Sequence, residues 1–259
     1  MSNVIYSISP NTLLFVLSCL FSVFAFLLLR AFNVFWPAHS RIEHNEIAGV
    51  ILGVVGVTYA VILGAVAVGT WEKANSLGAQ IEAEVSASSD VYRLSKGLNP
   101  SLQAKLQFSI KKYLKVVIED EWPVMQAGGV PTEGLKIYNQ MIEDLAGYQP
   151  GNSAEQIFLD HILTNLDQLE DARRGRALAS LESLSPILYQ ACLIGSILVL
   201  VFCVSLGFKS RQIHSFFLVL LSFSMATVLT VIIVLDRPLM GAYQIGPDKF
   251  KKALFLLEH

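Results

Sequence analysis

Four uncharged hydrophobic stretches dominate the pattern of polar and apolar positions along this chain. They cover residues 13–29, 47–70, 187–208 and 215–235, and none contains Asp, Glu, Lys or Arg. At about 1.5 Å of rise per residue, each is long enough for a helix that crosses about 30 Å of hydrocarbon. The pattern therefore predicts an all-α integral membrane protein with four transmembrane helices and a membrane lipid bilayer as its surroundings.

The four stretches are grouped two and two around a long polar segment. We expect transmembrane helices one and two within residues 1–70, a helical domain at 71–186, helices three and four at 187–238, and a C-terminal tail at 239–259. Residues 257–259 resemble the start of an affinity tag, so the natural chain is expected to end just before them.

The polar segment has helical signals throughout and no strand signals. The second span has no breaker at its end, so its helix is predicted to continue to about Lys96. Asn99 and Pro100 form a start signal for the next helix. The last helix of the segment is predicted to run to Leu184 and to meet the third span at Pro186. Continuous helices would make the domain and the membrane layer one body.

Charge is distributed unevenly along the chain. The formal net charge is −2, but residues 72–182 hold 16 acidic and 11 basic residues, a net of −5, which leaves +3 elsewhere. Such a chain offers no basic surface for nucleic acid. Four spans place both termini and the polar domain on one side, and the Lys and Arg count near the membrane favours the cytoplasm for that side. A bacterial inner membrane is the expected location.

The second span carries small residues at spacings of four, three, four and four, which places them on one helical face. In lipid, such a face lets another helix approach closely. The neighbour is either another span of the same chain or the same helix in another copy. The small face consists of Gly49, Gly53, Gly56, Ala60 and Gly64. In an oligomer the face offset by half a turn would line a hydrophobic conduit, formed by Ile51, Val55, Thr58 and Ile62.

Two sets of charged residues flank the membrane spans and are candidates for the wall of a vestibule. One set would attract cations and comprises Glu72, Glu82, Glu84 and Asp90. The other would attract anions and comprises Arg173, Arg174 and Arg176. The two sets predict opposite selectivity.

No acid, base or histidine lies deep in any span, which argues against a proton-coupled transporter. The absence fits a passive channel and equally a non-conducting membrane scaffold. No nucleophile–base pair or phosphate loop has the spacing that an enzyme requires, and we expect no cofactor. His39 and His44 lie near two glutamates in the first loop, but Pro37 interrupts the helical spacing, so no metal is predicted.

Several short motifs together resemble the bestrophin-like domain family of bacterial and plant membrane proteins. The resemblance covers nearly the whole chain. The motifs are Asn45 with Gly49 at the start of span two, Tyr59, Trp71, Glu84, Glu121-Trp122, Arg173-Arg174-x-Arg176, and Leu235-Asp236-Arg237-Pro238 with Gly241 after span four.

The resemblance implies a relation to bestrophins, which are pentameric ion channels. Their second membrane helix lines a hydrophobic neck, their cytosolic vestibule is helical, and both termini lie inside. A homo-oligomer, with a pentamer favoured, and permeant ions are therefore expected, and anion selectivity is favoured by analogy. The alternatives are a cation-selective channel of the same architecture and a scaffold or sensor that recruits a partner through its cytoplasmic helices.

Overall fold

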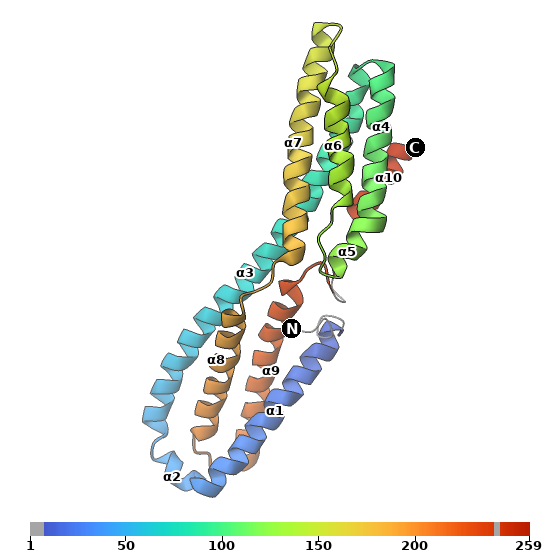
Figure 1. Cartoon of the computed structure of the whole chain (residues 1–259). Helices are drawn as coiled ribbons and strands as arrows, with labels where there is room; N and C mark the ends of the chain where they lie inside the picture. The colour runs from blue at the N-terminus through green and yellow to red at the C-terminus, as the bar shows by residue number, and fades with distance from the viewer. Residues whose placement is uncertain (1–7, 241–243) are drawn as a thin grey trace. The chain divides into compact units, whose positions relative to one another are not determined.

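The computed structural model describes residues 8–240 and 244–259, and within these ranges it is helical without strands. Figure 1 follows the helices along the chain. Their bounds are α1 Pro10–Phe35, α2 Ala38–Ile42, α3 Asn45–Leu94, η1 Ser95–Gly97, α4 Pro100–Val116, η2 Val117–Glu121, α5 Trp122–Gln126, α6 Glu133–Ala146, α7 Ser153–Leu181, α8 Pro186–Ser205, α9 Arg211–Asp236 and α10 Asp248–Glu258. The predicted all-α class is confirmed.

Contacts divide the chain into two compact units. The membrane unit comprises Met1–Ala74 and Ser183–Tyr243, and the polar unit comprises Asn75–Glu182 and Gln244–His259. Helix α3 contributes to both. Four helices, namely α1, the α3–η1 segment, α8 and α9, are long and apolar enough to cross a membrane, as the hydrophobic pattern predicted.

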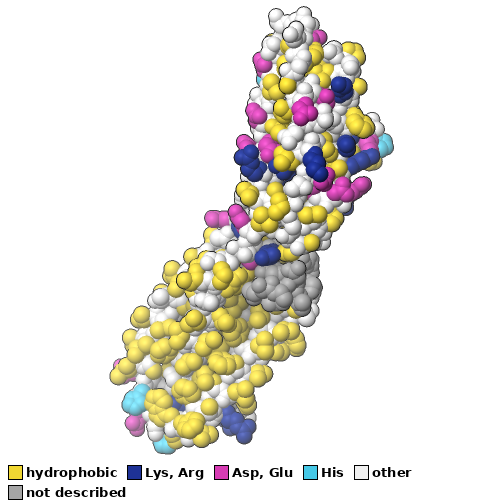
Figure 2. Space-filling view, in the orientation of Figure 1, with side chains coloured by type: hydrophobic (Ala, Val, Ile, Leu, Met, Phe, Trp, Pro, Cys, Tyr) yellow, Lys and Arg dark blue, Asp and Glu magenta, His cyan; other side chains and the backbone are white. Residues whose placement is uncertain are grey.

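The membrane unit packs α1, α3, α8 and α9 around an apolar core. Ala25, Leu200, Ala226 and Ile232 have no exposed surface in it. Tyr59 is a polar member of this core: its hydroxyl shares a 2.5 Å hydrogen bond with Ser196 and donates to the carbonyl oxygen of Cys192 at 3.1 Å. Both contacts satisfy polar atoms that lipid would leave unpaired. On the face of this unit that Figure 2 shows, hydrophobic side chains cover most of the surface.

Two polar side chains hold the short connections of the membrane unit. Arg41 is buried and donates to the carbonyl oxygen of Val204 at 2.6 Å and to the side chain of Asn33. The amide group of Asn45 brackets Gly207, donating to its carbonyl oxygen at 2.7 Å and accepting from its N–H at 2.8 Å. These contacts fix the start of α3 against the loop that follows α8.

The polar unit contains the second half of α3 together with α4, α5, α6, α7 and α10. The predicted start of α4 is confirmed, since Asn99 accepts from the N–H of Leu102 and Pro100 is the first helical residue. The segment expected to be a tail includes α10, whose buried Phe250 packs on Trp122 at 5.7 Å between ring centroids.

The predicted helix continues beyond the second span, but α7 does not continue into the third span. Helix α3 runs unbroken through Leu94, and η1 extends it to Gly97, as predicted. The expected continuation of α7 to Leu184 is wrong, because α7 ends at Leu181 and α8 begins only at Pro186. Proline disfavours helical geometry in the preceding residue, and Ser185 accordingly has a non-helical ψ of 134°.

Candidate functional site

The small face of α3 has no neighbour within the described part of the chain. A Cβ atom added at Gly49, Gly53, Gly56 or Gly64 would meet no heavy atom within 4 Å. Ala60 on the same face is exposed as well. Packing against another span of the same chain therefore does not account for these small residues.

The buried face of α3 lies to one side of this small face. Tyr59, Leu63, Val66 and Thr70 are all less than a tenth exposed and point into the membrane unit. With 3.6 residues per turn, the small face and the predicted lining face fall on opposite flanks of this buried face. Each flank is thus free to contact lipid or another copy of the chain.

The predicted lining residues lie on the flank of α3 that adjoins α8. Ile51 is 44% exposed and Ile62 40% exposed, while Val55 is half-buried. The Thr58 hydroxyl is exposed and donates to the carbonyl oxygen of Val54 at 2.9 Å. Val55, Thr58 and Ile62 border a hollow of about 290 Å³ that α8 closes on its other side.

A third row of α3 points most directly away from the core and was missed from the sequence. Its four members are each 65–67% exposed, which is more than Ile51 or Ile62. Every face of this span is apolar, so periodicity alone does not separate the rows. The valine row consists of Val50, Val54, Val57 and Val61.

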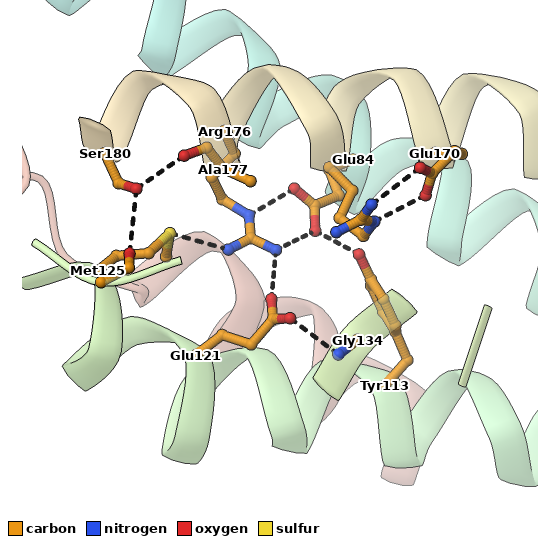
Figure 3. A network of polar contacts seen from close by, with 11 residues as sticks. Glu84, Tyr113, Glu121, Met125, Gly134, Glu170, Arg176, Ala177 and Ser180 are labelled. Carbon is orange, nitrogen blue, oxygen red and sulfur yellow. Dashed lines mark hydrogen bonds and ion pairs between the residues drawn. The ribbon is translucent and has the colours of Figure 1, made fainter. Parts of the chain in front are cut away.

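A buried ion-pair network forms the centre of the polar unit (Figure 3). Arg176 of α7 donates from Nε to Oε2 of Glu84 at 2.7 Å and from Nη2 to Oε1 of Glu84 at 2.9 Å. The same Nη2 donates to Oε2 of Glu121 at 2.7 Å. The three side chains are at most 1% exposed. Three segments that are distant in sequence therefore meet through one guanidinium group.

Neutral donors complete the coordination of both carboxylates. The Tyr113 hydroxyl donates to Oε1 of Glu84 at 2.5 Å, and the N–H of Gly134 donates to Oε1 of Glu121 at 2.8 Å. The Arg176 guanidinium also lies 5.9 Å from the Trp122 ring centroid. The network thus satisfies buried charge with hydrogen bonds that join five helical segments, as buried ions require.

Electrostatics in this network favour the charged arginine and the neutral tyrosine. Burial opposes the charged form of Arg176, but the charge and hydrogen bonds of Glu84, with Tyr113 and Glu121, outweigh it and raise the pKa of the guanidinium. Burial, followed by the Glu84 charge, raises the pKa of Tyr113 well above its ordinary value. Tyr113 therefore remains a hydrogen-bond donor throughout the neutral pH range.

This network corrects the expected set of vestibule charges. Glu84 and Arg176 lie inside the unit, so they form a structural ion pair and are not part of a charged wall. Arg173 is also buried and makes two hydrogen bonds, of 2.7 and 2.8 Å, to Glu170. Motif spacing could not reveal this, because long polar helices usually expose their charged residues.

The other vestibule candidates reach solvent. Glu72 is exposed, and Glu82 is exposed while it pairs with Lys249 at 3.1 Å. Asp90 pairs with Arg93 of the next turn. Arg174 is exposed, with Glu170 3.7 Å from its guanidinium.

The motif after span four fastens the end of α9 to the start of α8. Asp236 is fully buried and accepts from the N–H of Leu184 at 2.5 Å and from the Tyr189 hydroxyl at 2.8 Å. Lys73 donates to the carbonyl oxygen of Asp236 at 3.3 Å. Gly241, the last residue of the motif, lies outside the described residues.

The histidines of the first loop do not form part of a metal site in the described ranges. No group of three or more His, Cys, Asp or Glu residues in residues 8–240 and 244–259 is placed to hold a metal ion. His44 instead lies near Trp36, with 6.0 Å between the ring centroids.

Comparisons with known proteins agree on one family and one fold. The sequence profile described as Bestrophin-like domain matches residues 19–250. A point mutant of a bacterial bestrophin homolog from Klebsiella pneumoniae superposes with a TM-score of 0.67 at 11% identity, covering 95% of this chain and 99% of that one. A second mutant of that homolog gives 0.63 at 14% identity, covering 91% and 97%. No curated protein matches the chain.

Proposed function

The chain belongs to the bestrophin-like family, and from that premise we propose that it assembles into an oligomeric ion channel that conducts ions passively. Bestrophins are known as channels and not as enzymes. The observation that carries the proposal is the glycine face of α3, where an added Cβ would meet no atom of residues 8–240 and 244–259 within 4 Å. A second copy of the chain is the partner that such a face accommodates.

The physics of helix association in lipid supports this assignment. Lipid tails are as apolar as leucine, so membrane helices associate through close packing and not through a hydrophobic driving force. Four glycines on one face let two backbones approach without steric cost. In a closed ring each α3 would pack its glycine flank on a neighbour. A pentamer is the favoured ring, by the resemblance to bestrophins.

The axial pore in this proposal is lined by α3. The row of Ile51, Val55, Thr58 and Ile62 is the proposed lining, and the more exposed valine row is the competing one. Both rows are apolar, so either would form a hydrophobic constriction that gates by dewetting. The absence of Asp, Glu, Lys, Arg and His from residues 47–70 fits passive conduction.

Selectivity for anions is proposed by analogy with bestrophins. One observation favours cations instead. The polar unit carries 17 acidic and 13 basic residues in 75–182 and 244–259, a net charge of −4. Its solvent-accessible acids include the exposed Glu82 and the half-buried Asp90, with the exposed Glu72 just before the unit. A cytoplasmic polar unit and an inner-membrane location complete the proposal, on the Lys and Arg distribution.

Two measurements test the proposal in sequence. Native mass spectrometry of the protein in nanodiscs gives the oligomeric state, and five copies are expected. Flux in proteoliposomes under separate Cl⁻, K⁺ and Na⁺ gradients then gives conduction and selectivity, and Cl⁻ flux is expected to be the fastest. A monomer without flux of any ion would reject the channel and favour the scaffold, while faster K⁺ and Na⁺ flux would reject only the anion assignment.

A further inference from the structure

A groove of about 550 Å³ lies within the polar unit, between the last turns of α3 and helix α10. The two helices run in the same direction there. Lys249 pairs with Glu82 at 3.1 Å near one end, and Lys96 and Leu256 line the groove toward the other. The part of the lining that α3 contributes runs from Glu82 to Arg93, a length of about 16 Å.

The floor of the groove is apolar. Val85 and the ring of Tyr92 line it from α3, and Ala253 and Leu256 line it from α10. Leu256 remains 63% exposed. An apolar strip of this kind, open to solvent on a charged unit, is a feature that binding sites share.

The rim of the groove carries four cations and one carboxylate. Arg93 pairs with Asp90, and Lys249 pairs with Glu82, which is the carboxylate of the lining. Lys96 and Lys252 take part in no ion pair among those found in residues 8–240 and 244–259. The groove is therefore locally positive within a unit whose net charge is −4.

We propose that this groove binds a single-chain anionic amphiphile, such as a fatty acid or an alkyl phosphate. Lys252 follows Lys249 by one turn and Lys96 follows Tyr92 by one turn, so an ammonium group is available toward each end of the groove to hold the anionic head by charge-assisted hydrogen bonds. The linear chain lies along Val85, Ala253 and Leu256 and covers part of their apolar surface. The volume falls within the range of small-molecule sites, and the elongated form suits an unbranched chain. Lysine stems extend the apolar surface while their heads remain at the rim.

The site does not depend on the proposed channel, because it is formed entirely by α3, η1 and α10 within the polar unit. The requirement for a negative head group distinguishes binding in the groove from partition into the surrounding lipid. Partition into a bilayer needs only the alkyl chain, whereas the groove requires a negative head group. The experiment therefore compares head groups at constant chain length.

Photolabelling of the full-length protein in nanodiscs, with a dodecanoic acid that carries a diazirine, tests the proposal. Mass spectrometry is expected to find the label in residues 82–96 and 249–256. Excess dodecanoate or dodecyl phosphate should remove this label, and the stronger competitor identifies the head group. Dodecanol and dodecyltrimethylammonium should leave it. Equal competition by dodecanol, or label confined to the membrane spans, would overturn the proposal, since either indicates partition alone.

Paired variants locate the head group. Lys96→Gln with Lys252→Gln should lower labelling of the groove by about tenfold, the effect of removing a hydrogen bond to a charged group. Lys136→Gln is the matched control, because Lys136 is exposed on α6 outside the groove. Label in the membrane spans of each variant provides the internal reference. Unchanged labelling in the double variant would contradict the assignment.

Discussion

Replacement of Arg176 by methionine tests whether the buried ion-pair network stabilises the polar unit. The change leaves Glu84 and Glu121 buried without their shared cation, since both carboxylates are at most 1% exposed. Removal of one partner from a buried ion pair costs about 3–5 kcal/mol. A protein of this size loses about 2–4 °C in Tm for each kcal/mol. We therefore expect Arg176→Met to lower the Tm by about 6–20 °C.

Tryptophan fluorescence during thermal unfolding in one detergent is the assay. The Trp122 ring lies 5.9 Å from the Arg176 guanidinium and 5.7 Å from the Phe250 ring, so its emission reports on the packing of this core. Trp122 is almost fully buried before unfolding and becomes solvated after it.

The matched control is Arg174→Met on the same helix, two residues before Arg176. Its side chain is 63% exposed, so the change should alter stability by less than about 0.5 kcal/mol. Glu84→Gln should cost less than Arg176→Met, because Arg176 retains Glu121 as a partner. A Tm for Arg176→Met within about 2 °C of the control would refute the reasoning, since it would mean that the two carboxylates do not need the cation.

Three further predictions concern the pore, the oligomer and a local pH effect. Ile62→Ala should raise single-channel conductance if the Ile51 row lines the pore, and Val61→Ala should do so if the valine row lines it; unchanged currents in both would exclude α3 as the lining. Gly53→Leu should dissociate the oligomer in native mass spectrometry without unfolding the chain, because a Cβ at that position would meet no atom of the described residues within 4 Å. In contrast, Gly195→Leu should destabilise the fold, because a Cβ there would collide with the Tyr59 ring; an intact pentamer for Gly53→Leu would contradict the packing argument. The Tyr148 hydroxyl and the N–H of Gly151 lower the pKa of Glu155 below 4.5, so the stability from these contacts is present above pH 4.5 and is lost as pH falls through the lowered pKa. Glu155→Gln should remove this acid dependence, measured as Tm against pH from 3 to 6, and an unchanged profile would show that the loop does not depend on the carboxylate.

The sequence alone determined the features that depend on local pattern. Uninterrupted apolar length specified the four spans, because only a helix satisfies its own backbone in lipid at that length. Asn99 and Pro100 specified the start of α4, since a cap and a fixed φ act on neighbouring residues only. Most of the family motifs could also be recognised in the sequence, because each is a short run of neighbouring residues.

The tertiary structure decided everything that required residues distant in sequence to meet. The sequence identifies three charged residues on polar helices, Glu84, Glu121 and Arg176. Only the packing of α3, η2 and α7 removes them from water and makes them partners. The three apolar rows of α3 could not be ranked from hydrophobicity, because lipid, a pore and a neighbouring copy all accept apolar side chains. Only the positions of Tyr59 and Leu63 against the core defined which faces remain free.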